Sequence, residues 1–441
     1  MDCFRIEGGR RLSGRMNVEG SKNAALPLMA ASLLTDGPME LHDVPDLSDT
    51  RNMMRLLEDL GIEIESCGTD RYRFRTVDPS AIHARYQVVR TMRASICVLG
   101  PLLARRRQAI VSMPGGCAFG SRPVDLHLRG LEALGAKVTL KGGDIHCSAD
   151  RLKGTTIFLG GPFGSTVLGT ANVMSAATVA TGTTIIEAAA CEPEVADLAA
   201  LLNAMGARIE GAGTPRITIR GVDELGPAVH RVMPDRIVAG TYAAAAAVTN
   251  GDVEIADFPH DCLLSAIDRF REIGVNVERM DPAEDPLRCS VRVTSERQLR
   301  PTMITTQPHP GFPTDLQAQF MTLLCLANGN SIITEKIYPE RFMHVAELSR
   351  MGANLIRQGP TVMVVGGPRL IGAQVMASDL RASACLVMAG LAAEGVTIVN
   401  RVYHLDRGYV RMEETLNALG AMIERIDERE VDPAETAMLE Q

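Results

Sequence analysis

The hydrophobic and polar positions of the chain repeat six times. Each copy predicts an amphipathic helix that ends in a Leu-Gly, Met-Gly or Ile-Gly dipeptide, followed by a strand of alternating residues. A helix that turns directly into a strand needs a left-handed residue at its end, and glycine adopts that conformation without strain. Self-similarity at a fixed period predicts a fold built from similar units, called repeats below. Their glycines are Gly61, Gly135, Gly206, Gly274, Gly352 and Gly420, so neighbouring copies are 68 to 78 residues apart.

Each repeat also predicts a second helix and a second strand, both ahead of the amphipathic helix. The second helices consist of small apolar residues with almost no charge, which predicts burial on every side. We expect these inner helices at residues 24–34, 94–104, 170–180, 237–248, 316–327 and 381–393. The strands that follow them are expected within 37–44, 107–114, 182–189, 251–258, 329–337 and 395–402. The pattern therefore predicts an α/β fold in which sheets and amphipathic helices surround buried helices.

The length of 441 residues favours two domains of three repeats each, because one ordinary core does not grow so large. We expect residues 22–230 to form the first domain. Residues 1–21, which add a strand, and residues 231–426 would form the second. The acidic tail, residues 427–441, is expected to be disordered.

Composition narrows the function. Hydrophobic residues make up 46% and charged residues 22% of the chain, which is typical of a soluble globular enzyme. A net charge of −8 and an aromatic content of 4% argue against binding to nucleic acid or to an anionic membrane. We recognise no targeting or transmembrane segment, no metal-ligand cluster and no nucleotide-binding glycine motif. The ten cysteines lack CxxC pairs and are typical of reduced thiols in a cytoplasmic protein.

Polar residues gather at the predicted starts of the inner helices. Helix N-termini present unpaired N–H groups and a partial positive charge, so they favour anions. If the starts within each domain point one way, two such surfaces facing across a hinge would bind a highly charged small substrate. The residues are Lys22, Asn23, Arg93, Thr166, Asp235, Arg236, Asp315, Asp379 and Arg381.

The loop after the strand of the second repeat differs from its counterparts. Two glycines precede Cys117 and Gly-Ser-Arg122 follow it, which predicts a mobile, exposed cysteine and not a buried thiol. The guanidinium of Arg122 and the following helix start would favour the thiolate. His127, one helical turn further on, is more typical of a packing residue than of a catalyst.

Two further positions carry candidate chemistry. Asp315 opens an inner helix, where an aspartate is a common N-cap; a carboxylate in a cationic cleft is also a suitable general base. Both interpretations stay open, since Thr314 could cap instead. Arg341 and Arg407 occupy equivalent loops of the fifth and sixth repeats, and arginine suits phosphate and carboxylate.

Together these motifs resemble the UDP-N-acetylglucosamine 1-carboxyvinyltransferases, a family of enolpyruvyl transferases. The resemblance runs from Phe4 to about Ile426. It implies a pair of inside-out α/β barrels, and transfer of the enolpyruvyl group of phosphoenolpyruvate to the 3′-hydroxyl of UDP-N-acetylglucosamine, the first committed step of peptidoglycan synthesis. The motifs are Gly-Ser-Lys22-Asn23-Ala-Ala-Leu-Pro, Pro-Gly-Gly-Cys117, Ser-Arg122-Pro-Val-Asp125-Leu-His, Phe-Pro-Thr-Asp315-Leu-Gln-Ala-Gln, Arg341-Phe-Met-His, Asp379-Leu-Arg381-Ala-Ser and Asp406-Arg407-Gly-Tyr.

The resemblance also implies roles for individual residues, with no metal or cofactor. Lys22, Arg122 and Arg407 would hold phosphoenolpyruvate. Cys117 would protonate its methylene carbon, could form a covalent adduct and would be alkylated by fosfomycin. Asp315 would accept the proton of the sugar hydroxyl. The implied UDP-sugar site and the remaining substrate contacts are Asn23, Arg93, Arg122, Pro123, Val124, Asp125, Leu126, Thr166, Val167, Asp315, Ile337, Arg341 and Arg381.

Two departures from the family pattern leave alternatives. Leu168 stands where the family usually has glycine, and Pro339-Glu340 replaces the usual Glu-Asn. These residues would suit a paralogue that binds UDP-sugar without catalysis, although the catalytic positions are intact. Another hydroxyl acceptor, such as shikimate 3-phosphate, is also conceivable, but the Cys117 loop argues against it. An enzyme of related fold that acts on nucleic-acid ends would need a basic groove, which the net charge of −8 disfavours.

Overall fold

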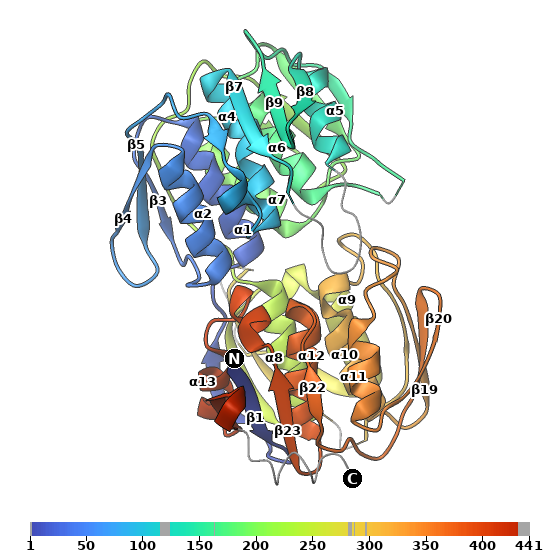
Figure 1. The fold of residues 1–441 in the computed structure, drawn as a ribbon. Helices are drawn as coiled ribbons and strands as arrows, with labels where there is room; N and C mark the ends of the chain where they lie inside the picture. Colours follow the sequence, from blue (N-terminus) through green and yellow to red (C-terminus); the bar gives the residue numbers. More distant parts are fainter. Residues whose placement is uncertain are drawn as a thin grey trace. The chain divides into compact units, whose positions relative to one another are not determined.

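The computed structural model describes residues 2–114, 124–162, 164–280, 285, 287–295 and 298–430. The described residues divide into two compact units (Figure 1). The first unit contains residues between 20 and 233, and the second contains residues 2–19 together with residues from 234 onward. Each unit has its own sheets and its own buried helices.

Every sheet among the described residues has four strands and the same plan: an edge strand parallel to its neighbour, then two antiparallel pairs. Those of the first unit are β14 (Ala228–Arg231), β3 (Met39–His42), β5 (Tyr72–Thr76), β4 (Ile62–Ser66); β6 (His83–Ala84), β7 (Gln108–Ser112), β9 (Asp144–Ser148), β8 (Lys137–Lys141); and β10 (Thr156–Phe158), β11 (Thr183–Glu187), β13 (Arg216–Arg220), β12 (Arg208–Glu210).

The sheets of the second unit follow this plan. They are β2 (Ser13–Asn17), β15 (Asp252–Phe258), β17 (Cys289–Ser295), β16 (Val275–Arg279); β18 (Met303–Thr305), β19 (Asn330–Thr334), β21 (Thr361–Val365), β20 (Asn354–Gln358); and β22 (Gln374–Met376), β23 (Val396–Asn400), β1 (Asp2–Glu7), β24 (Met422–Asp427).

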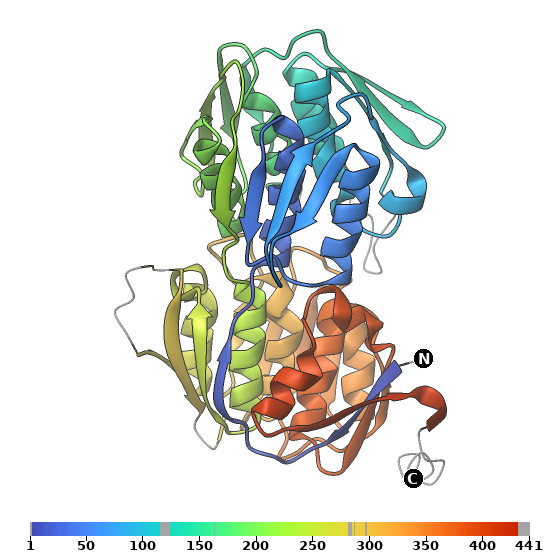
Figure 2. The ribbon, with the colours of Figure 1, turned by 90° about the vertical axis from the view of Figure 1, so that its left-hand side faces the viewer.

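The N-terminal residues differ from the prediction. Where the sequence predicts one strand in residues 1–21, the structure has two, and they lie in different sheets: β1 between β23 and β24, and β2 beside β15. In Figure 2 the blue N-terminal strand lies beside the red C-terminal part of the chain. The single-strand prediction was wrong because Gly8 and Gly9 break the segment, and each half then pairs with a remote partner.

The predicted inner helices are confirmed. In the second unit α8, α10 and α12 pack against one another and lie side by side in Figure 1. Every residue of α8 is buried, as expected for a helix without a charged face. The inner helices are α1 (Lys22–Ala30) with η1 (Ala31–Leu34), η2 (Arg93–Val98) with α4 (Leu99–Arg106), α6 (Val167–Ala177), α8 (Arg236–Val248), η4 (Thr314–Leu316) with α10 (Gln317–Cys325), and α12 (Leu380–Ala392).

The amphipathic helices end as the sequence predicts. All six glycines of the repeated dipeptides have positive φ, from 78° at Gly61 to 104° at Gly206. The helices are α2 (Ser48–Asp59), α5 (Asp125–Ala133), α7 (Pro193–Ala204), α9 (Leu264–Ile273), α11 (Met343–Arg350) and α13 (Met412–Ala418). Shorter helical segments are α3 (Tyr86–Val89), η3 (His260–Cys262), η5 (Val402–Arg407) and η6 (Glu428–Glu430).

The C-terminal tail begins later than the sequence predicts. Asp427 is the last residue of β24 and pairs with Asp2, and residues 428–430 form η6. The prediction of disorder from Asp427 onward was wrong for these residues because the strand extends to the end of its partner. Residues 431–441 lie outside the described residues.

Candidate active site

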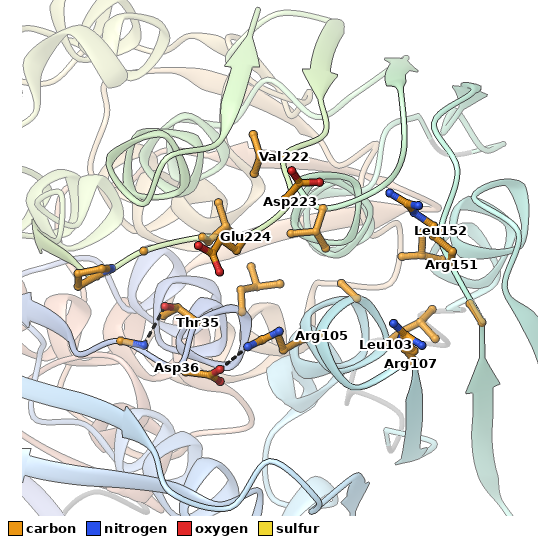
Figure 3. A pocket seen from close by; sticks show the side chains of 18 of the residues that line it. Thr35, Asp36, Leu103, Arg105, Arg107, Arg151, Leu152, Val222, Asp223 and Glu224 are labelled. Atoms are coloured by element: carbon orange, nitrogen blue, oxygen red, sulfur yellow. Dashed lines mark hydrogen bonds and ion pairs between the residues drawn. The ribbon is translucent and has the colours of Figure 1, made fainter.

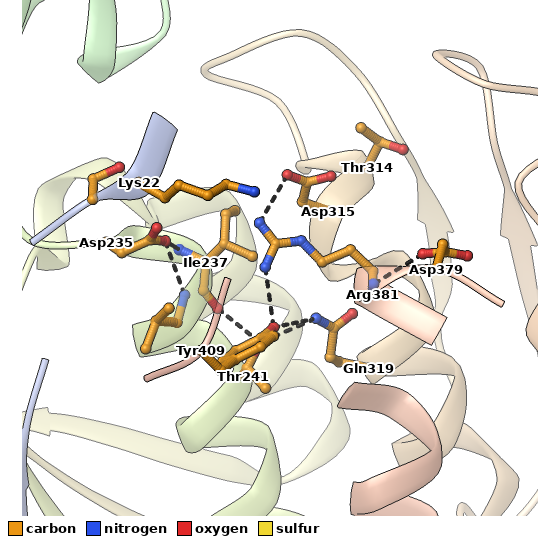
Figure 4. A network of polar contacts seen from close by, with 12 residues as sticks. Lys22, Asp235, Ile237, Thr241, Thr314, Asp315, Gln319, Asp379, Arg381 and Tyr409 are labelled. Atoms are coloured by element: carbon orange, nitrogen blue, oxygen red, sulfur yellow. Dashed lines mark hydrogen bonds and ion pairs between the residues drawn. The ribbon is translucent and has the colours of Figure 1, made fainter. Parts of the chain in front are cut away.

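A half-buried carboxylate lies between two arginines in the second unit. Asp315 belongs to η4, and its Oδ1 accepts from Nη1 of Arg341 at 2.7 Å. Its Oδ2 accepts from Nη2 of Arg381 at 3.1 Å (Figure 4). The side chains of Arg341 and Arg381 are only 8% and 4% exposed. Each carboxylate oxygen therefore has its own charged donor.

This arrangement fixes the charge of Asp315. Burial alone would raise the pKa of its carboxyl group, but the positive charges of Arg381 and Arg341 outweigh burial and hold that pKa well below its usual range. Burial alone would lower the pKa of Arg381, and the nearby Asp315 reverses that direction and raises it. Asp315 is therefore a carboxylate at neutral pH.

The N-cap interpretation of Asp315 was wrong. The residue lies inside η4, whose N-cap is Pro313 and carries no side-chain hydrogen bond. Thr314 does not cap the helix either: its hydroxyl donates to Oε2 of Glu335 at 2.8 Å and accepts from Nη1 of Arg341 at 3.1 Å. The arginines draw the carboxylate away from the backbone, so the role of a proton acceptor stays a prediction.

Glu335 organises the loop that carries two predicted residues, and the sequence analysis missed it. Its buried carboxylate accepts from the hydroxyls of Thr306 and Thr314, and from the backbone N–H groups of Ile337 and Tyr338 at 2.8 and 2.9 Å. These bonds hold the segment between Ile337 and Arg341. The available signal was an acidic residue directly after a predicted strand whose residues alternate between buried and exposed.

The other inner helices of the second unit start at aspartates. Asp235 Oδ1 accepts from the backbone N–H groups of Ile237 and Val238, so Asp235 caps α8. Asp379 caps α12 in the same way, through the backbone N–H groups of Arg381 and Ala382. Arg407 is the last residue of η5 and is half-buried.

In the first unit, Lys22 is the first residue of α1 and is 9% exposed. Its Nζ donates to Oδ2 of Asp49 at 3.3 Å, in the first turn of α2. Nothing in the sequence distinguishes Asp49, since an aspartate in a first helical turn is ordinary. Asn23 follows Lys22 and is half-buried.

The remaining predicted residues of this unit lie at neighbouring helix starts. Arg93 begins η2, which contacts both α1 and α6. Thr166 caps α6 by accepting from the backbone N–H of Gly169 at 3.2 Å, and Val167 is the first residue of that helix. Leu168 follows and is half-buried.

The segment after β7 is described only in part. Val124 is buried, Asp125 is exposed at the start of α5, and Leu126 is half-buried. The predicted residues Cys117, Arg122 and Pro123 lie outside the described residues.

His127 is a packing residue, as predicted. It is 4% exposed, and its Nδ1 accepts from Nδ2 of Asn172 at 2.9 Å. Burial, with a smaller contribution from the charge of Arg93, lowers the pKa of His127 to about 4, so the ring is neutral at pH 7. Asn172 also binds the carbonyl of Ile96 and the N–H of Gly100, which joins α6 to the neighbouring inner helix.

The described cysteines are free thiols, most of them buried, with Cys67 exposed and Cys191 and Cys262 half-buried. Within the described parts of the chain, no three His, Cys, Asp or Glu side chains lie close enough to hold a metal ion. No helix in those same parts is long and apolar enough to cross a membrane.

A pocket of about 470 Å³ opens in the first unit at the C-terminal ends of its inner helices (Figure 3). It is lined by arginines and carboxylates together, and Arg105 pairs with Asp36 within it. Helix C-termini carry a partial negative charge, unlike the helix starts at which Lys22, Arg93 and Thr166 lie in this unit. The pocket contains none of those residues and is not a candidate active site.

Comparison with known proteins decides the family. A family model described as EPSP synthase (3-phosphoshikimate 1-carboxyvinyltransferase) matches residues 6–416. The UDP-N-acetylglucosamine 1-carboxyvinyltransferase of Desulforapulum autotrophicum is 52% identical, covering 97% of this chain and all of the relative. That of Geotalea uraniireducens is 48% identical with the same coverage. The chain belongs to the family of UDP-N-acetylglucosamine 1-carboxyvinyltransferases.

Solved structures show that the fold is that of enolpyruvyl transferases. The enolpyruvyl transferase NikO from Streptomyces tendae has a TM-score of 0.85 at 25% identity, covering 96% of this chain and 99% of its own. EPSP synthase from Acinetobacter baumannii has a TM-score of 0.74 at 17% identity, covering 97% and 100%. The predicted fold class, six α/β repeats with buried helices, is confirmed.

Proposed function

We propose that this protein transfers the enolpyruvyl group of phosphoenolpyruvate to the 3′-hydroxyl of UDP-N-acetylglucosamine and releases phosphate. The observation that carries the proposal is the identity of 48 to 52% to relatives of that name over their full length. The product would enter peptidoglycan synthesis in the cytoplasm, and the reaction would need no metal or cofactor.

The proposed reaction is an addition followed by an elimination. The 3′-oxygen of the sugar bonds to C2 of phosphoenolpyruvate as its proton passes to Asp315, and Cys117 donates a proton to C3. The Cys117 thiolate then takes a proton back from C3 as the C2–O bond to phosphate breaks, and the departing phosphate takes the proton from Asp315. One enol ether and one phosphate result, with no change in oxidation state.

The surroundings of Asp315 suit this sequence in a particular way. Arg341 and Arg381 keep the carboxylate ionised, which a proton acceptor requires, but a strongly lowered pKa also makes it a weak base. Phosphate and carboxylate groups of a bound substrate would share the donors of both arginines and so raise the basicity of Asp315. Substrate binding would thereby activate the acceptor.

The cationic residues have a matching role. Lys22, Arg122 and Arg407 would hold the anionic groups of phosphoenolpyruvate, and stabilise the charge of the departing phosphate. In the described structure Lys22 donates to Asp49, a contact that would keep its ammonium group extended and charged before substrate arrives. Asn23, Arg93, Thr166, Val167, Ile337 and residues 122–126 would contact the UDP-sugar.

The decisive experiment measures phosphate release from phosphoenolpyruvate with UDP-N-acetylglucosamine, with shikimate 3-phosphate, and with no acceptor. We expect release only with the UDP-sugar, and loss of release after treatment with fosfomycin. Cys117→Ser should abolish turnover and leave UDP-sugar binding intact. Cys67→Ser, which alters an exposed thiol of the first unit, should retain activity.

Release with shikimate 3-phosphate instead would favour the other acceptor, which the description of the matching family model names. Binding of UDP-N-acetylglucosamine without any phosphate release would favour a non-catalytic paralogue, and would point to Leu168 and Pro339 as the altered positions.

A further inference from the structure

A buried chain of hydrogen bonds lies behind Arg381 and connects it to two other inner helices (Figure 4). Nη1 of Arg381 donates to the hydroxyl of Tyr409 at 3.1 Å, while Nη2 holds Asp315. The Tyr409 hydroxyl lies 2.9 Å from Oγ1 of Thr241, and Nε2 of Gln319 donates to Thr241 at 3.0 Å. Of these four side chains, only Arg381 is among those for which the family resemblance implies contact with substrate.

The donor and acceptor groups of this chain allow only one orientation of its hydrogen bonds. Arginine has no acceptor, so the Tyr409 oxygen must accept from Arg381. Its own hydrogen then goes to Oγ1 of Thr241, because Gln319 also acts as a donor toward both hydroxyls. Thr241 in turn donates to the carbonyl of Ile237 at 2.8 Å within α8. If the hydroxyl of Tyr409 or of Thr241 donated to a different partner, one of these hydrogen bonds would be lost.

The chain is also inaccessible to water, so its bonds cannot be replaced by solvent. Tyr409 is 1% exposed and Arg381 3%, while Thr241 and Gln319 are fully buried. The guanidinium of Arg381 also lies 5.7 Å from the centre of the Tyr409 ring, within range of a cation–π contact. Removing one hydroxyl would leave a buried charged donor without its acceptor.

Tyr409 further connects this chain to the loop of Arg407. It stands two residues after Arg407, and its backbone N–H donates to the carbonyl of Leu405 within η5 at 3.0 Å. One tyrosine therefore anchors the segment that carries Arg407 and the side chain of Arg381 at the same time.

We infer that Tyr409 is a positioning residue: its hydroxyl, supported by Thr241 and Gln319, fixes the Arg381 guanidinium against Asp315. The kinetic consequence rests on the proposed function, because it concerns the placement of the proton acceptor. A displacement of about 1 Å in such a constellation can cost up to about a hundredfold in rate.

The test is Tyr409→Phe, which keeps the ring and removes the hydroxyl. We expect kcat for phosphate release to fall about tenfold or more, with the KM for UDP-N-acetylglucosamine changed less than about twofold. The matched control is Tyr242→Phe, which removes the hydroxyl of another buried tyrosine, on α8 beside Thr241 and outside the chain. That variant should keep kcat within about twofold of the unaltered protein.

The Tyr409→Phe substitution made in the Arg381→Ala variant separates positioning of Arg381 from a general structural effect. If Tyr409 acts through Arg381, then adding Tyr409→Phe to Arg381→Ala should lower kcat no further. A loss in the double variant equal to the product of the two single losses would overturn the inference, and so would an unchanged kcat in Tyr409→Phe.

Two further measurements test the role of Tyr409 if Tyr409→Phe does not fold or if the unaltered protein releases no phosphate. If Tyr409→Phe does not fold, Thr241→Val removes the acceptor of the Tyr409 proton at almost constant volume; a smaller fall in kcat is expected, and no fall overturns the inference. If the unaltered protein releases no phosphate, the proposed function fails separately. The coupling of Tyr409→Phe with Arg381→Ala is then read from thermal unfolding, where strictly additive shifts in Tm would overturn it.

Discussion

At the scale of single residues, the site of the second unit is dominated by the charges of three side chains. Two nearly buried guanidinium groups, of Arg341 and Arg381, lie on the two oxygens of one carboxylate. Asp315 offsets the repulsion between the two arginines, with smaller contributions from the charges of Asp379 near Arg341 and Asp235 near Arg381. The residue proposed to accept a proton therefore also holds its own site together, and its two roles can be separated by measuring stability apart from activity.

We predict that Asp315→Asn lowers the free energy of unfolding by about 3 kcal/mol, because it leaves two like charges close together in a buried site. Asp36→Asn is the matched control, since Asp36 pairs with Arg105 but is 62% exposed, and it should cost less than about 1 kcal/mol. Urea unfolding of both variants measures the difference. Equal costs would show that Arg341 and Arg381 do not depend on the Asp315 charge.

The direction of the pKa shift fixes how this effect depends on pH. Arg381 and Arg341 lower the pKa of Asp315 in the folded state, so its stabilisation is present above the unfolded pKa of about 3.9 and is lost as pH falls through the folded pKa. The difference between the unaltered protein and Asp315→Asn should therefore stay constant from pH 8 to pH 5.

At the scale of elements, the repeated glycines terminate helices in the same conformation but in different surroundings. A Cβ added at Gly206 would meet no atom within 4 Å, whereas one added at Gly61 would lie 2.1 Å from the carbonyl oxygen of Asp78. Both glycines have positive φ, at 104° and 78°. A substitution at either glycine would therefore strain the backbone in the same way, but only a substitution at Gly61 would add a steric clash.

We predict that Gly206→Ala costs about 1 kcal/mol of unfolding free energy, the price of a left-handed alanine. Gly61→Ala should cost about 2 kcal/mol more, because the backbone around Asp78 must move. Urea unfolding of the two variants, with unchanged m-values, measures both. Equal losses would indicate that local strain alone decides the stability of these helix ends.

At the scale of the whole molecule, the six repeats form two units with separate cores, and the predicted site residues are divided between them. Lys22, Asn23, Arg93, Thr166 and Val167 belong to the first unit, and Asp315, Ile337, Arg341, Arg381 and Arg407 to the second. No single repeat carries the whole set, so the proposed reaction needs the complete chain.

We predict that UDP-N-acetylglucosamine raises the unfolding midpoint of the protein, since a ligand that binds only the folded state stabilises it by about 3 kcal/mol at a hundred times its Kd. Shikimate 3-phosphate at the same concentration should not shift the midpoint. Thermal unfolding with each compound measures this without catalysis. A shift with shikimate 3-phosphate alone would contradict the proposed acceptor.

The sequence by itself determined the repeat, the inner helices, their polar starts and the glycine ends, because each depends on residues close together in the chain. It could not assign β6, β10, β18 and β22, which are two or three residues long and too short for a hydrophobic period. Nor could it foresee that β1 pairs with β23 and β2 with β15.

Only the tertiary structure decided which side chains meet. Asp49 reaches Lys22 from another helix, Glu335 gathers the Ile337 loop, and Tyr409 connects Arg381 to Thr241. Each of these residues is ordinary in its own stretch of sequence, as a first-turn aspartate, a charge after a strand or a tyrosine in a loop. Their roles follow from partners far away in the chain, which only packing brings within hydrogen-bond distance.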